Sequence, residues 1–129
     1  MTGWEHVASF KIPGRPTPKG RPRFTRAGRA YTPKTTRDAE KQVVDLFEFE
    51  CPLWEPTLED VRLTVDVLFK GKRNADLDNI AKLCSDALNG AAYADDRQVR
   101  ELHVTGFENT GDLVGVVVSF AIWKGTDHD

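Results

Sequence analysis

The spacing of hydrophobic residues predicts four β-strands. The clearest covers residues 61–69, where every second residue from Val61 to Phe69 is apolar, and a period of two is typical of a half-buried strand. A similar alternation predicts a first strand over residues 7–12, and residues 99–107 and 113–123 predict two more. Three consecutive valines at positions 116–118 indicate burial on both faces, so we expect the last strand to lie centrally in the sheet.

Two segments repeat their apolar residues at helical spacing. One covers residues 35–49, begins with Thr35 and Asp38 in an arrangement that resembles a capping box, and has an apolar face of Ala39, Val43, Leu46 and Phe47. The other begins near Asp76 and stops near Gly90. Its apolar positions follow the helical period and are Ile80, Leu83, Cys84, Ala87 and Leu88.

The order strand, helix, strand, helix, strand, strand predicts one α+β domain over residues 1–129. Its sheet should be mixed, with about four strands, two helices packed on one face and the last two strands joined as a hairpin. Residues 13–23 contain four prolines and two glycines, which prevent regular structure. We therefore expect a basic, Pro-rich extended loop after the first strand.

Charge divides the chain into a basic segment and an acidic remainder. The formal net charge is −2, but residues 11–41 hold ten basic and two acidic side chains, a local net charge of +8. The other 98 residues carry eight basic and eighteen acidic side chains, a net charge of −10. The basic segment favours a polyanion partner. The acidic remainder indicates either solvation or a clustered carboxylate site.

Cysteine spacing and hydropathy limit the class of protein. Cys51 and Cys84 lie 33 positions apart and match no zinc-ligand pattern, so we expect two reduced thiols. No apolar run approaches the roughly 20 residues that span a bilayer. Residues 1–10 lack the basic and then apolar pattern of a signal peptide. These features favour a cytoplasmic protein that makes no membrane contact.

Acidic residues follow one predicted strand and precede another. Asp76 and Asp78 come between the strand of residues 61–69 and the second helix, and Asp95 and Asp96 come just before the strand of residues 99–107. If these strands are neighbours, we expect the carboxylates to converge at one end of the sheet. Carboxylates are the ligands that Mg²⁺ prefers, and carboxylate-bound metal ions support phosphodiester hydrolysis.

Lys82 lies on the same helix face as Asp78, four residues further on. An ammonium group there would stabilise negative charge that develops on a phosphate. The same residues also admit structural roles. Asp76 is a suitable helix N-cap, Asp78 and Lys82 are spaced for an exposed ion pair, and Asp95 and Asp96 suit a solvated turn.

Several motifs together resemble the RusA family of Holliday junction resolvases. The resemblance covers nearly the whole chain. It rests on Asp76-Leu77-Asp78-Asn79, Lys82, Asp86-Ala87-Leu88, Asp95-Asp96-Arg97-Gln98-Val99, Pro18-Lys19-Gly20-Arg21-Pro22-Arg23 and Tyr31-Thr32-Pro33.

The resemblance implies a metal-dependent endonuclease that resolves four-way DNA junctions in recombination and repair. It implies that Asp76, Asp78 and Asp96 bind Mg²⁺, or Mn²⁺ in its place, and that Lys82 is the functional lysine. The stretch from Asn89 to Ala94 is about one residue shorter than the family pattern, so Asp95 is the alternative third ligand. The resemblance also implies a homodimer that makes paired nicks, without a small-molecule cofactor.

The basic arm, which we define as residues 15–29, is the predicted DNA-binding element. Its basic side chains should contact phosphates, which dominate affinity and carry no sequence information directly. Phe24 is either a stacking platform for an exposed base or an anchor in the core, and Tyr31 is a second stacking candidate. The predicted DNA contacts are Lys19, Arg21, Arg23, Phe24, Arg26 and Arg29.

Symmetry favours two copies of the chain. A four-way junction offers two equivalent strands, and a two-fold dimer matches that symmetry. Trp4, Trp54 and Trp123 are assigned to the core or to the dimer interface. Two alternatives stay open, namely a non-catalytic module for branched DNA and a nuclease that cuts flaps, forks or RNA. A bacterial host, with a phage or prophage origin, fits a nuclease of this size.

Overall fold

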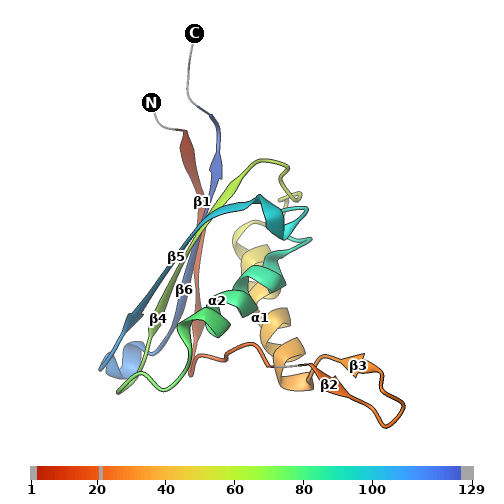
Figure 1. The fold of residues 1–129 in the computed structure, drawn as a ribbon. Helices are drawn as coiled ribbons and strands as arrows, with labels where there is room; N and C mark the ends of the chain where they lie inside the picture. Colours follow the sequence, from red (N-terminus) through yellow and green to blue (C-terminus); the bar gives the residue numbers. More distant parts are fainter. Residues whose placement is uncertain (1–2, 21, 126–129) are drawn as a thin grey trace.

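The two helices cover one face of a four-stranded mixed sheet (Figure 1). This architecture comes from a computed structural model that describes residues 3–20 and 22–125. The sheet contains β1 (Trp4–Pro13), β4 (Val61–Leu68), β5 (Val99–Phe107) and β6 (Gly115–Trp123) in the order β1-β6-β4-β5. The helices are α1 (Lys34–Glu50) and α2 (Leu77–Leu88). The predicted α+β class with a mixed four-stranded sheet is confirmed.

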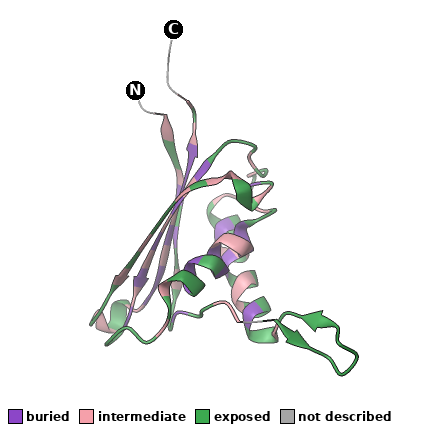
Figure 2. Ribbon diagram, viewed as in Figure 1, coloured by how far each residue is buried: buried purple, intermediate pink, exposed green. Residues whose placement is uncertain are grey.

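The alternation of β4 creates the core side of the sheet. Val61, Leu63, Val65 and Val67 are all fully buried, and the residues between them are half-buried. Both helices pack on this side of the sheet, and the ribbon in Figure 2 colours their buried residues purple. Phe47 of α1 meets Phe120 of β6 with ring centroids 5.9 Å apart in an edge-to-face arrangement, which adds specific geometry to simple area burial.

The predicted central position of the last strand is confirmed, because β6 lies between β1 and β4. The predicted hairpin between the last two strands is wrong. β6 pairs antiparallel with β4 and β1, whereas β5 pairs parallel with β4 on its other side. The connection crosses the end of β4, where the backbone N–H of Thr110 donates to the carbonyl of Phe69 at 2.9 Å. β4 therefore separates the two strands that follow each other in sequence.

The helix termini differ in how they are capped. The predicted capping box at Thr35 is wrong, since α1 begins after Pro33 and has no side-chain cap. The neighbouring hydroxyl of Thr36 is buried and accepts a hydrogen bond from the backbone N–H of Gly20 at 3.0 Å. This contact attaches the loop after β1 to the start of α1. In α2 the cap is Asp76, and the five predicted apolar positions are buried.

Two further features agree with the sequence. Cys51 and Cys84 are free thiols, and Trp54 is partly buried against the core, where its indole N–H donates to the carbonyl of Ala92 at 2.9 Å. Trp4 and Trp123 pack edge to face at 5.1 Å at one end of the β1 and β6 pair. None of the helices described in residues 3–20 and 22–125 has the length and apolar character to cross a membrane.

Candidate active site and nucleic-acid interface

The start of α2 carries two of the predicted metal-binding carboxylates. Asp76 is the N-cap of the helix, and its Oδ1 accepts the backbone N–H of Asp78 at 3.0 Å. Both aspartates are exposed and border an open depression lined by residues 73–78. Asp76 therefore caps the helix and also forms, with Asp78, an exposed pair of carboxylates.

The other two aspartates belong to a short 3₁₀ turn, η1 (Asp96–Gln98), at the start of β5. Asp95 caps this turn, accepting from the backbone N–H of Arg97 at 2.9 Å and from its guanidinium at 3.1 Å. Its own N–H donates to Gln98 Oε1 at 2.8 Å. The Arg97 backbone bond, followed by the Arg97 side-chain bond, lowers the pKa of Asp95. Asp96 is exposed.

Within one chain these two acidic groups do not meet. β4 and β5 run parallel, so Asp76 and Asp78 follow the end of one strand, whereas Asp96 precedes the start of its neighbour. α2 separates the groups (Figure 1), and its 12 residues correspond to about 18 Å of helix. Among the described residues, no three His, Cys, Asp or Glu side chains are grouped to hold a metal. The expected convergence at one end of the sheet is therefore wrong for a single chain.

Lys82 lies midway along α2 with its side chain 63% exposed. Its Nζ is 3.5 Å from Asp86 Oδ2. Among the described residues, Lys82 forms no ion pair with Asp78, which was the structural alternative for these two side chains. Lys82 thus points its charge toward solvent beside a carboxylate on the same helix face, the position from which an ammonium group can reach a bound phosphate.

Lys19 lies between the two helices. Its Nζ is 2.7 Å from Asp86 Oδ2 and 3.1 Å from Glu40 Oε2, and its side chain is 25% exposed. Burial alone would lower the pKa of Lys19, but hydrogen bonds and charges from Asp86 and Glu40 outweigh burial and raise it. The backbone N–H of Lys19 also donates to the carbonyl of Asn79 at 3.0 Å. Lys19 therefore attaches the basic arm to both α1 and α2.

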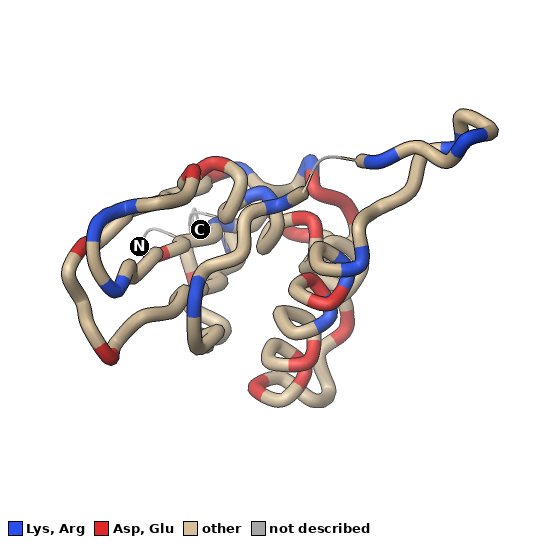
Figure 3. Tube along the Cα trace, turned by 90° about the horizontal axis from the view of Figure 1, so that it is seen from below, with Lys and Arg blue, Asp and Glu red and all other residues tan. Residues whose placement is uncertain are grey.

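Beyond this attachment the chain forms a projecting hairpin of β2 (Arg23–Phe24) and β3 (Ala30–Tyr31). Its tip closes through the backbone N–H of Thr25, which donates to the carbonyl of Arg29 at 2.9 Å. Figure 1 shows the hairpin extending away from the sheet, and Figure 3 shows the basic residues along it. Sequence patterns did not predict this hairpin, because each strand has only two residues and neither alternates.

The hairpin exposes aromatic as well as basic side chains. Phe24 is 68% exposed and Tyr31 is 46% exposed, so the alternative in which Phe24 anchors the loop in the core is wrong. Arg23, Arg26 and Arg29 are exposed beside them. Arg21, the remaining predicted DNA contact, lies outside the described residues. Exposed aromatic rings among positive charges are the combination that stacks on bases while contacting phosphates.

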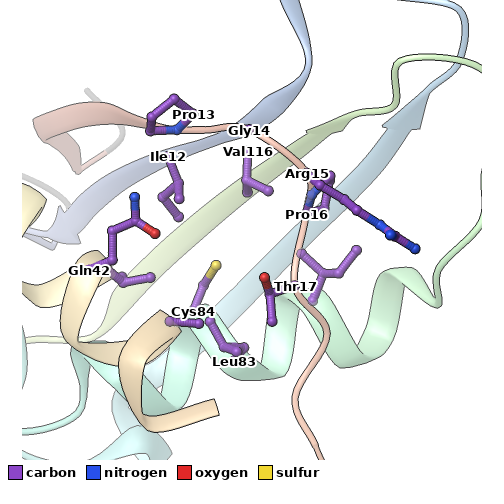
Figure 4. Close-up of a pocket in the computed structure, with 13 residues that line it drawn as sticks. Ile12, Pro13, Gly14, Arg15, Pro16, Thr17, Gln42, Leu83, Cys84 and Val116 are labelled. Atoms are coloured by element: carbon purple, nitrogen blue, oxygen red, sulfur yellow. The ribbon is translucent and has the colours of Figure 1, made fainter. Parts of the chain in front are cut away.

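A small cavity lies where the loop leaves β1 and crosses the helices (Figure 4). Its volume is about 30 Å³, and its lining includes Ile12, Thr17, Gln42, Cys84 and Val116. Ligand pockets usually measure several hundred Å³, so this cavity is too small for a nucleotide. It marks the packing of the loop on the helices.

The structure is that of a small α+β protein with a projecting basic hairpin and exposed carboxylates on the body. The chain matches the family model described as endodeoxyribonuclease RusA over residues 13–119. It therefore belongs to the RusA family, and this membership implies an endonuclease that resolves Holliday junctions, with branched DNA as its substrate. A search of curated proteins finds no match.

Proposed function

We propose that the protein is a metal-dependent junction-resolving endonuclease whose active site is shared between two copies of the chain. In this arrangement Asp76 and Asp78 of one protomer act together with Asp96 of its partner. The observation that carries the proposal is the parallel pairing of β4 with β5, which separates the two acidic groups within one chain. In a dimer with a two-fold axis, Asp96 of each protomer would complete the carboxylate pair of the other, so two equivalent sites would form.

The donor set fits a hard divalent cation such as Mg²⁺, with Mn²⁺ as a substitute. Asp76 uses Oδ1 to cap the helix, which leaves Oδ2 for another partner, and Asp78 and Asp96 are exposed. Magnesium is typically held by a few carboxylates while it keeps several waters. A cation bound there would supply the charge that activates water and stabilises the leaving oxygen.

Asp96 is favoured over Asp95 as the third ligand. The Asp95 carboxylate already accepts two hydrogen bonds from Arg97 and closes a reciprocal cap with Gln98. Recruiting it to a metal would remove the cap of η1, whereas Asp96 can turn to a metal without that loss. Asp95 then holds η1 in shape and so positions Asp96.

The remaining residues would bind and orient the DNA. Arg23, Arg26 and Arg29 on the hairpin are placed to contact phosphates, and Phe24 and Tyr31 to stack on bases exposed at the branch point. Lys82 would stabilise charge on the scissile phosphate. Lys19, also predicted to contact DNA, is better suited to holding the hairpin in place, since two carboxylates already neutralise it.

The proposal is tested by mixing two inactive chains. If the site is shared, a mixed dimer of Asp78→Asn and Asp96→Asn protomers contains one intact site, formed by Asp76 and Asp78 of the second protomer and Asp96 of the first. Such mixtures should nick one strand of a junction although neither variant cuts alone. If each chain carried a complete site, the mixture would stay inactive, and this result would sink the shared arrangement.

A second function is favoured by the caps, because Asp76 and Asp95 both have structural partners. In that reading the protein binds branched DNA without cutting it.

A cleavage assay on a four-way junction, a flap and a linear duplex distinguishes a junction nuclease, a flap nuclease and a non-catalytic binding protein. The salt concentration is fixed, since phosphate-driven affinity falls steeply with salt. Resolution of the junction alone supports the proposed function in recombination and repair, while cutting of flaps would assign a different substrate. The cytoplasm of a bacterium, with a phage or prophage origin, remains the predicted setting.

A further inference from the structure

We propose that Lys19 is a positioning residue for the cleavage reaction, because it neutralises Asp86 and so leaves the ammonium group of Lys82 free for the scissile phosphate. The inference rests on the proposed function, in which Lys82 stabilises negative charge on that phosphate. It gives the basic arm a second role. Besides binding DNA, the arm controls where the proposed catalytic lysine points.

Asp86 lies between two lysines that come from different parts of the chain. Its Oδ2 is 2.7 Å from Nζ of Lys19 and 3.5 Å from Nζ of Lys82. Lys82 is four positions before Asp86 on α2, a spacing that favours an ion pair within a helix. Lys19 nevertheless makes the closer contact. The arm therefore competes with the lysine of α2 for one carboxylate oxygen.

The exposed fractions of the side chains show which lysine is held. Lys19 and Asp86 are 25% and 20% exposed, whereas Lys82 is 63% exposed. Charges that are shielded from solvent attract each other more strongly than exposed charges do. Asp86 therefore pairs mainly with Lys19, and the ammonium group of Lys82 turns to solvent.

Loss of the Lys19 charge reverses this balance. Lys19 also pairs with Glu40, at 3.1 Å, so these two lysines and two carboxylates carry no net charge together. Without Lys19, the carboxylates of Asp86 and Glu40 lose the cation that they share. Asp86 then draws Lys82 toward itself and away from a bound phosphate.

Backbone contacts fix Lys19 in this position. Its N–H donates to the carbonyl of Asn79 in the first turn of α2 at 3.0 Å. The next N–H, that of Gly20, donates to the buried hydroxyl of Thr36 on α1. A Cβ on Gly20 would lie only 2.7 Å from that oxygen, so this close approach requires glycine. The side chain of Lys19 is thus delivered to Asp86 by a segment that is attached to both helices.

The test compares Lys19→Gln with the double variant Lys19→Gln/Asp86→Asn in the full-length chain. Single-turnover cleavage of a four-way junction is measured at saturating protein, so that weaker binding does not enter the rate. Lys19→Gln should cut about fivefold more slowly, the factor that corresponds to an ion pair of about 1 kcal/mol. The double variant should recover most of the rate, because a neutral amide no longer attracts Lys82.

Chemical labelling of Lys82 gives a readout that does not depend on cleavage. Acetic anhydride reacts with unprotonated amines, and an ion pair with a carboxylate slows the reaction because it favours the protonated form. Peptide mass spectrometry should show slower labelling of Lys82 in Lys19→Gln than in the wild type, and a normal rate in the double variant. Lys19→Arg keeps the charge and should leave the labelling rate unchanged. Lys41→Gln, which removes the ion pair of Asp45 on α1, is the matched control and should change neither cleavage nor labelling of Lys82.

A purely anchoring role for Lys19 predicts a different order of rates. Asp86→Asn would then loosen the arm further, so a double variant as slow as Lys19→Gln, or slower, would overturn the inference. Unchanged labelling of Lys82 in Lys19→Gln would also overturn it, whether or not the protein cuts DNA. If the wild-type chain cut no junction while labelling changed as expected, the proposed function would fail and the competition for Asp86 would be supported.

Discussion

Lys19 and Asp86 form the tightest ionic contact between the basic arm and the body, with Nζ and Oδ2 2.7 Å apart and both side chains largely shielded from solvent. The same carboxylate oxygen lies 3.5 Å from Nζ of Lys82. One carboxylate therefore faces both the root of the proposed DNA-binding hairpin and the proposed catalytic lysine. The position of the hairpin is in this way tied to the helix that carries the acidic site.

Asp86→Asn should loosen the arm, because the amide cannot balance the charge of the partly buried Lys19. We expect a loss of about 1–2 kcal/mol in the free energy of unfolding, between the values typical of exposed and buried pairs. Urea denaturation measures this loss, and trypsin should cut the basic arm faster in the variant. Asp38→Asn breaks an exposed pair with Lys34 on α1 and should change neither quantity. Equal losses in both variants would remove the anchoring role.

Cys84 should be unreactive in the folded protein. Burial raises its pKa to about 12, so at pH 8 only about one thiol in ten thousand is the reactive thiolate. Cys51 is less buried, although burial raises its pKa as well. Titration with a thiol reagent at pH 8 should label one cysteine per native chain and two after denaturation. Fast labelling of Cys84 in the native protein would contradict its placement in the core.

The regular elements of the fold could be predicted because their hydrophobic periods are local in sequence. The alternation in residues 61–69 and the apolar face from Ile80 to Leu88 both appear in the structure. The direction of strand pairing could not be predicted, since it depends on which strands compete for the two edges of β4. The prediction that Asp96 meets Asp76 and Asp78 at one end of the sheet was wrong for the same reason. Lys19 was predicted to contact DNA by its charge alone, and only the tertiary structure brings Glu40 and Asp86 to it.

Magnesium should stabilise the protein if the carboxylates form a shared site. Cation binding relieves repulsion between the clustered aspartates and favours the folded dimer by mass action. The melting temperature followed by circular dichroism should therefore rise with Mg²⁺, compared with potassium chloride at equal ionic strength. Asp96→Asn should lose most of this rise, whereas Asp112→Asn, in the exposed turn before β6, should keep it. An equal rise in both variants would indicate non-specific binding.

Lys82→Ala should slow cleavage much more than it weakens junction binding. A group that stabilises developing charge contributes mainly in the transition state, and its loss typically costs about 10²–10³ in rate. Single-turnover cleavage and a binding titration with Ca²⁺ in place of Mg²⁺ separate the two effects. Lys41→Ala is the control, because Lys41 is an exposed lysine paired with Asp45 on α1. If Lys82→Ala cuts at the wild-type rate, Lys82 has no part in the chemistry.

Phe24→Ala should reduce the preference for branched over linear DNA without affecting stability. The ring is 68% exposed, so its removal leaves no cavity in the core. A stacked base is worth about 1–3 kcal/mol, and duplex DNA offers no unstacked base to the hairpin, so only junction affinity should fall. Arg26→Ala should instead weaken binding to both DNAs and reduce its salt dependence, as expected for a phosphate contact. Competition titrations of a junction against a duplex of equal length measure both variants. A Phe24→Ala protein that lost affinity equally for the two DNAs would show that the ring reads no feature of the branch point.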